Sequence, residues 1–211
     1  MSALVDKTDA RWSRTRQRLL EGGRSVFSEV GVEVATVLDI VRAAGVSQPS
    51  FYNHFASKDE LAQEIAAEYF RHDRRAKMAV FKKVDDTAEA IAINIAQTLS
   101  IATTDPVIAW TLVKSETLRD LVISSSADPL VEMIREGVDK QRFKVMSAHT
   151  IALAIRGAAL ALVQDILNGT ADANASCCFQ ELVLRMLGLT PAESADVVAS
   201  AALHNVSSLE I

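Results

Sequence analysis

The segment from Ala35 to Phe55 constrains the fold of this chain more than any other stretch. Thr36 is placed to cap a short helix whose apolar positions 37, 40, 41 and 44 share one helical face. Gly45 then supplies a tight turn, and Ser47 is placed to cap a second short helix with Pro49 in its first turn. Two short helices joined by a glycine turn form the helix-turn-helix plan, whose second helix enters the major groove of DNA.

The second of these helices is expected to expose side chains that suit DNA. Phe51 and Phe55 lie four residues apart and should face the core. Side chains that can reach base edges through an amide, a ring or a hydroxyl are Gln48, Pro49 and Ser50. Groups that can hold phosphates, as side-chain donors or at helix N-termini, are Thr36, Tyr52, Asn53, His54 and Lys58. Such short helices also occur in many helical proteins, so the surrounding charge has to support this interpretation.

The charge is divided unevenly along the 211 residues. The whole chain has 22 Lys+Arg and 27 Asp+Glu, a net charge of −5, which excludes a uniformly basic polyanion binder. Residues 1–58 hold 8 basic and 6 acidic residues, whereas residues 59–211 hold 14 and 21. The segment from Arg11 to Arg24 concentrates five arginines against one acid. The chain therefore has a basic N-terminal part that favours DNA and an acidic remainder.

The composition predicts an all-α fold. Alanine, leucine and charged residues dominate, while only 8 Gly and 4 Pro occur, and three of the prolines (106, 129 and 191) follow a capping side chain at a predicted helix start. Thr190 and Glu193 form a capping box. The predicted helices cover residues 12–30, 37–44, 48–54, 58–81, 86–103, 106–113, 115–123, 129–141, 147–168, 174–187 and 191–203.

Several other classes of protein find no support in the sequence. The adjacent Cys177 and Cys178 suit a helix surface or core better than a metal or redox site, and neither a metal site nor another cofactor is expected. The four histidines are scattered, and no phosphate-binding loop or dinucleotide fingerprint occurs, so we expect no catalytic residues and no enzyme activity. The polar first residues do not form a secretory signal, and Ile151 to Leu167 is interrupted by polar residues. We therefore expect a cytoplasmic protein without a membrane partner.

The stretch from Arg16 to Leu61 resembles the DNA-binding domain of the TetR family of bacterial transcriptional regulators. The matching positions are Phe27 to Gly31, Thr36-Val37, Asp39-Ile40, Ala44 to Ser47, Phe51-Tyr52, His54-Phe55, Ser57-Lys58 and Leu61. They fit at fixed spacing without a gap. Gly22 and Gly23 depart from the family, which usually has alanines there, and should weaken the first helix by about 1 kcal/mol each.

The resemblance implies an N-terminal three-helix domain with a helix-turn-helix over residues 1–58. It also implies a helical domain for ligand binding and dimerisation over residues 59–211. In this family a homodimer binds a palindromic double-stranded DNA operator, usually as a repressor, and a small molecule releases it. By position, Gln48, Pro49 and Ser50 would read bases, and Thr36, Tyr52, His54 and Lys58 would hold phosphates. A helical ligand-binding or scaffolding protein without specific DNA binding is the alternative.

The helix predicted at 147–168 is apolar over most of its circumference and must therefore be buried on more than one side. With the helix at 174–187, it is expected to form a four-helix dimer interface across a two-fold axis. Its candidate contacts are Ile155, Ala159, Leu162, Phe179, Leu182, Val183 and Met186. A largely apolar effector would bind among the helices at 86–141 and beside the polar His149 and Arg156. The other candidate residues for this pocket are Trp110, Val113, Glu116, Arg119, Met133, Ile134 and Phe143. Ordinary core positions are the competing interpretation of the apolar candidates.

Overall fold

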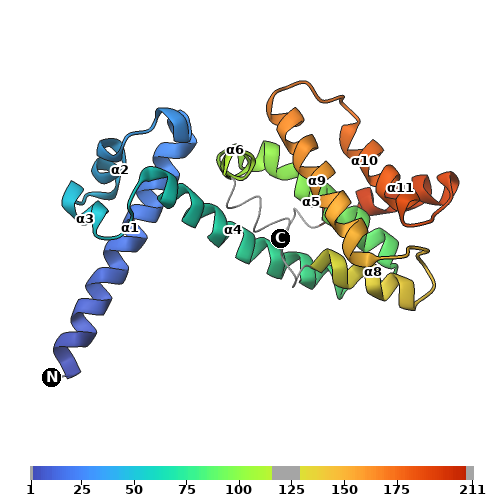
Figure 1. The fold of residues 1–211 in the computed structure, drawn as a ribbon, viewed down its shortest axis with the longest axis horizontal. Helices are drawn as coiled ribbons and strands as arrows, with labels where there is room; N and C mark the ends of the chain where they lie inside the picture. Colours follow the sequence, from blue (N-terminus) through green and yellow to red (C-terminus); the bar gives the residue numbers. More distant parts are fainter. Residues whose placement is uncertain (1, 116–128, 208–211) are drawn as a thin grey trace. The chain divides into compact units, whose positions relative to one another are not determined.

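The structure is a computed structural model that describes residues 2–115 and 129–207, and every regular element in these ranges is a helix (Figure 1). The all-α prediction is confirmed. The helices are α1 (Ser2–Val34), α2 (Val37–Ala44), α3 (Gln48–Tyr52), α4 (Lys58–Phe81), α5 (Thr87–Thr104), α6 (Pro106–Lys114), α8 (Pro129–Asp139), α9 (Ala148–Leu167), α10 (Ala175–Met186) and α11 (Pro191–Ser207). The predicted helix at 115–123 falls almost entirely outside the described residues.

Local capping explains most of these boundaries. Thr36 accepts a hydrogen bond from the amide of Asp39, whose carboxylate accepts one in return from the amide of Thr36. Thr190 and Glu193 form the same reciprocal box at the start of α11, as predicted. Prolines occupy the first positions of α6, α8 and α11, where a missing N–H group breaks no helical hydrogen bond. Short-range sequence signals therefore fix where these helices begin.

The first helix is longer than the sequence predicted. The expected start was Trp12, but α1 begins at Ser2 and continues to Val34. Gly31 interrupts it with a φ of 79°, a left-handed conformation that glycine adopts without steric cost. Gly31 therefore kinks α1, and one further helical turn follows it. The N-terminal residues extend the helix because nothing in their composition breaks it.

The first of two compact units contains α1, α2, α3, the first half of α4 as far as Phe70, and α6. Helix α1 packs against α2 and also against α6. The core of this unit contains Phe27, Ile40, Phe51 and Leu61, each at most 1% exposed. The sequence predicts a boundary between residues 58 and 59, close to the start of α4 at Lys58, whereas this unit continues to Phe70 and also includes α6, which is distant in sequence.

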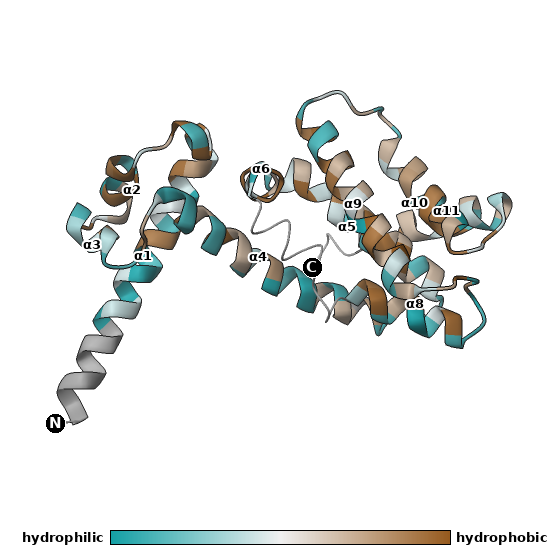
Figure 2. Cartoon of the chain, in the orientation of Figure 1, coloured by the Kyte–Doolittle hydropathy of each residue, from teal (hydrophilic) through white to brown (hydrophobic). Residues whose placement is uncertain are grey.

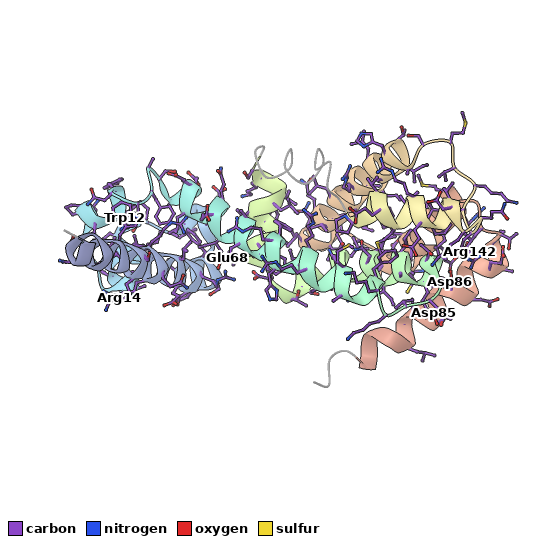
Figure 3. The ribbon with its side chains drawn as sticks, turned by 90° about the horizontal axis from the view of Figure 1, so that it is seen from below. Trp12, Arg14, Glu68, Asp85, Asp86 and Arg142 are labelled. Carbon is purple, nitrogen blue, oxygen red and sulfur yellow. The ribbon has the colours of Figure 1, made fainter. Side chains whose placement is uncertain are left out.

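The second unit is organised around α5, which contacts α8, α9, α10 and α11. Beside the start of α5, the guanidinium of Arg142 makes two hydrogen bonds of 3.0 and 3.1 Å to Asp86 (Figure 3). Burial would raise the pKa of Asp86, but these bonds and one from the Ala88 amide hold it below its usual range. The pair holds the segment after α8 against α5.

Much of the apolar surface of helix α9 is left uncovered by the other described residues. Figure 2 shows it mostly in the apolar half of the scale. It is long and apolar enough to cross a membrane by length and composition alone, yet one such helix is weak evidence for a membrane span. Ala152, Ile155 and Val163 are buried, whereas Leu153 and Gly157 are exposed. An apolar helix that is covered on one side only has a second face available for a partner.

Candidate DNA-binding site

Helices α2 and α3 form the predicted helix-turn-helix. Gly45 ends α2 in the left-handed conformation, with φ 60° and ψ 41°. Ser47 caps α3 by accepting a hydrogen bond from the amide of Ser50 at 3.3 Å. Phe51 is fully buried and Phe55 is 3% exposed. These two rings anchor α3 to the core, as the sequence predicted, and thereby fix which of its faces meets solvent.

The three residues predicted to read bases lie together on the first turn of α3. Gln48 and Pro49 are exposed, and Ser50 is half-buried. The hydroxyl of Ser50 lies 2.9 Å from that of Ser47, so its orientation is coupled to the helix cap. Gln48 therefore presents a free amide, and Ser50 presents a hydroxyl held in place. This is a surface with hydrogen-bonding groups of both kinds, as reading of base edges requires.

Three of the predicted phosphate-binding residues, Thr36, Tyr52 and Asn53, are exposed around this surface. Thr36 starts α2, and its side chain is held by Asp39. The ring of Tyr52 is 54% exposed and contacts the buried ring of Phe51 edge-on, with centroids 5.4 Å apart. The Tyr52 ring is thus oriented by the core while its hydroxyl stays available to solvent or a phosphate.

Lys58 has a structural partner that the sequence did not reveal. Its ammonium donates hydrogen bonds of 2.8 Å to the carbonyls of Glu33 and Ala35. These carbonyls belong to the end of α1 and to the link into α2. Because the ammonium has three donors, two of them are already used in joining α4 to α1. Lys58 therefore stabilises the scaffold of the site in addition to any phosphate contact.

His54 is partly covered by a side chain from the N-terminal half of α1. The ring of Trp12 packs against it with centroids 3.8 Å apart, and Nδ1 of His54 is buried without a hydrogen-bond partner among the described residues. Burial lowers the pKa of His54, and the positive charge of Arg16 lowers it further. The imidazole is therefore neutral at pH 7, so it offers packing and dipolar contacts but no positive charge.

A hollow of about 670 Å³ lies between α1 and the start of α3. Its walls include Arg11, Arg14 and Arg18 from α1, and Ser47 and Ser50 from the helix-turn-helix. Arg18 also donates a 2.6 Å hydrogen bond to the carbonyl of Gly45. Figure 3 shows Trp12 and Arg14 on the N-terminal part of α1. The sequence indicated an arginine-rich segment here, but not that these side chains would lie beside the first turn of α3.

Comparison with known protein families covers both parts of the chain. The model described as "Bacterial regulatory proteins, tetR family" matches residues 19–65. The model described as "Tetracyclin repressor-like, C-terminal domain" matches residues 86–200, more than half of the chain. The chain belongs to the TetR family. It is thereby assigned to a family of regulatory proteins and not to an enzyme family, as expected from the sequence.

The curated relatives match a short part of the chain. The repressor DhaR of Mycobacterium sp. (strain GP1) is 46% identical over 55 residues, 26% of this chain and 28% of that protein. The repressor KstR2 of Mycobacterium tuberculosis is 38% identical over 61 residues, 29% of this chain and 30% of that protein. The matches thus span less than a third of either relative.

Solved structures share the whole fold at low identity. RolR in complex with resorcinol has a TM-score of 0.75 at 21% identity, and covers 90% of this chain and 95% of its own. FadR of Bacillus subtilis in complex with stearoyl-CoA has a TM-score of 0.63 at 17% identity, and covers 82% and 99%. At these identities the likeness establishes the TetR-family fold of both domains.

The residues predicted for an effector pocket are divided between the two units. Trp110 and Val113 belong to α6 in the first unit, and Glu116 and Arg119 lie outside the described residues. His149 is exposed. The remaining four are buried in the second unit: Met133, Ile134, Phe143 and Arg156. The sequence could not separate these groups, because an apolar position at helical spacing gives no information about which helix it packs against.

The residues predicted for a dimer interface also differ in exposure. Ile155, Ala159, Phe179 and Val183 are buried against their own subunit and have little surface to offer a partner. Leu182 and Met186 are 53% and 37% exposed, and Leu162 is half-buried. The exposed small or apolar residues of α9 are Leu153, Ala154, Gly157, Ala158 and Ala161, and those of α10 include Leu182 and Met186.

Proposed function

We propose that this chain is a cytoplasmic transcriptional repressor that binds a palindromic operator as a homodimer and is released by a small molecule. The observation that carries the proposal is the first turn of α3, where Gln48, Pro49 and Ser50 form a capped and accessible surface. The core rings of Phe51 and Phe55 hold that surface outward. A TetR-family chain with this surface presents an accessible recognition helix, which a helix-turn-helix protein requires in order to bind DNA.

Specific recognition of the operator would come from the first turn of α3. The amide of Gln48 can pair with N6 and N7 of an adenine, and the ring of Pro49 can pack against a thymine methyl. Ser50 can donate to or accept from a base edge, with its hydroxyl oriented by Ser47. Each good bidentate base contact contributes about 1–3 kcal/mol of discrimination.

Phosphate contacts would surround this turn on two sides. Thr36, Tyr52 and Asn53 are exposed beside it. Arg11 and Arg14 extend the positive surface along α1, and Arg18 joins them at Gly45. Such contacts position the protein on the duplex and supply affinity that salt weakens. His54 and Lys58 belong to the scaffold that holds them in place.

Dimerisation would bury the exposed face of α9 and α10. Only 22% of the most apolar window of α9 is buried within the chain. The small side chains at Ala154, Gly157 and Ala158 would let a partner helix approach closely, and Leu182 and Met186 would pack from α10. A two-fold axis through this face joins two subunits as a four-helix interface.

The effector would bind in the second unit. Arg156 is 9% exposed and lies on the largely apolar α9. Met133, Ile134 and Phe143 supply apolar surface in the same unit. We infer an effector with a largely apolar body. The ligands named for RolR and FadR, resorcinol and stearoyl-CoA, are consistent with an organic effector.

Salt-dependent binding to DNA tests this function. Fluorescence anisotropy would follow the chain on a duplex from the region upstream of its own gene and on an unrelated duplex of equal length. We expect tighter binding to the upstream duplex, and a loss of roughly 10³-fold or more in affinity between 50 and 200 mM salt. A helical scaffold or ligand-binding protein would bind neither duplex at any salt concentration, and that result would overturn the proposal.

A further inference from the structure

A second cavity lies inside the first unit, apart from the effector site proposed in the second. It has a volume of about 580 Å³, is open to solvent on one side, and is bordered by the end of α1, the start of α4, and α6. This volume falls within the range of sites that hold small organic ligands. None of the functions described above uses it.

The walls of this cavity are mainly apolar. Phe27 and Val30 line it from α1, Ala62 from α4, and Val107 and Trp110 from α6. A Cβ atom at Gly31 would meet nothing within 4 Å, so the kink in α1 borders open space. The indole of Trp110 is half-buried and offers the largest flat surface of the wall. An apolar or aromatic body would therefore be desolvated favourably here.

The ammonium group of Lys114 lies at the polar end of the cavity. The ammonium of Lys114 lies 5.2 Å from the centroid of the Trp110 ring and 2.8 Å from a carboxylate oxygen of Glu33. Both contacts are ones that an ammonium group of a ligand would make. The lining also includes Asp59, so two acidic residues and one basic residue line the cavity, and Lys58, which is not part of this lining, donates to the backbone carbonyl of Glu33. The side chains of Lys114 and Glu33 are 51% and 73% exposed, so their pair can open at little cost.

We propose that this cavity binds a cationic amphiphile, whose apolar body lies against Phe27, Val107 and Trp110 and whose ammonium takes the place of the Lys114 ammonium beside Glu33. The acidic excess of the lining favours a cation over an anion. The proposal does not depend on DNA binding, since its test uses the free protein. It also does not depend on the effector, for which we propose a site in the other unit.

Tryptophan fluorescence provides a direct measurement of this site. The chain has two tryptophans, so Trp12→Phe leaves Trp110 as the single reporter. The cationic probe is trimethyl(4-phenylbutyl)ammonium, and 5-phenylpentanoate is an anion of similar length and apolar surface. We expect the cation to change Trp110 fluorescence saturably and to bind at least tenfold more tightly than the anion, since its charge is attracted by the ring and by Glu33.

Two variants should change the affinity for the cation in opposite directions. In the Trp12→Phe background, Lys114→Met removes the internal competitor and should tighten binding by about three- to tenfold, whereas Glu33→Gln should weaken it by a similar factor. Lys140→Met is a matched control, because Lys140 forms an exposed ion pair with Glu136 in the second unit. It should leave binding unchanged. Thermal unfolding of each variant would verify that it folds.

The proposal is overturned if the cation produces no saturable change, if the anion binds as tightly as the cation, or if Lys114→Met weakens binding or leaves it unchanged. Should Lys114→Met fail to fold, Glu33→Gln carries the test, and unchanged affinity in that variant contradicts the proposal. A saturable change that is equal for both probes would indicate a purely apolar pocket and would also contradict it.

Discussion

At the scale of single residues, His54 shows how a side chain expected at DNA can serve the scaffold. Its imidazole packs on Trp12, and burial lowers its pKa from the ordinary 6.5. The unfolded chain then binds a proton more readily than the folded one, so the free energy of unfolding falls as the pH drops through 6.5. This stabilisation is fully present above that value and is lost toward the lower, folded-state pKa.

We therefore predict an acid-sensitive first unit. Urea unfolding followed by tryptophan fluorescence should give a lower free energy of unfolding at pH 5.5 than at pH 7.5. His54→Gln should reduce this difference, and His149→Gln, at an exposed position of the second unit, should leave it unchanged. An equal pH dependence in all three proteins would show that His54 does not cause it.

At the scale of helices, the two glycines of α1 are better explained by packing than by helix propensity. The sequence identified Gly22 and Gly23 as weak points in a helix. A Cβ at Gly22 would lie 2.8 Å from the backbone nitrogen of Ala44, and one at Gly23 would lie 2.6 Å from the end of the Leu61 side chain. The glycines thus let α1 approach α2 and α4 closely.

This contact predicts a reversal of the usual propensity order. At an exposed position inside a helix, alanine stabilises the helix by about 1 kcal/mol relative to glycine. Gly22→Ala should nevertheless lower the free energy of unfolding by about 1–3 kcal/mol, because the backbone of Ala44 cannot rotate away. Gly23→Ala should cost less, since Leu61 can adopt another rotamer. Urea denaturation of both variants measures the difference, and a stabilised Gly22→Ala would refute the packing explanation.

At this scale, the local features of the helices could be predicted from the sequence, whereas the contacts between distant segments could not. Caps at Thr36, Ser47 and Thr190 are local, and the predicted helix starts beside them agree with the structure to within a residue. Contacts between segments distant in sequence, such as Lys58 with Glu33 or α6 with α1, are not encoded in any short pattern. A helix such as α9, which is apolar on most sides, gives little signal in the sequence for the face that its own chain buries.

At the scale of the whole molecule, the divided charge agrees with a basic DNA-binding end and an acidic body. Two such subunits joined through α9 and α10 should place their α3 helices roughly 34–36 Å apart when bound to DNA, one turn of the duplex. The exposed apolar face on these helices is the physical reason to expect the dimer.

A charge placed on that face should separate the subunits. Leu182 is 53% exposed, so Leu182→Glu should fold and yet shift the mass seen by sedimentation equilibrium from dimer toward monomer. Leu203→Glu introduces the same charge on α11, where the side chain is 72% exposed and outside this face, and should remain a dimer. A dimeric Leu182→Glu would place the interface elsewhere.

Operator discrimination by α3 is the most direct test of the function proposed here. The ratio of affinities for the upstream duplex and an unrelated duplex would be measured for the native chain, for Gln48→Ala with Ser50→Ala, and for Gln97→Ala in α5 as a control. We predict that the double variant lowers this ratio about 10- to 100-fold while largely retaining affinity for the unrelated duplex, since it removes base contacts and leaves phosphate contacts. An unchanged ratio in the double variant would contradict the assignment of α3 as the helix that reads DNA.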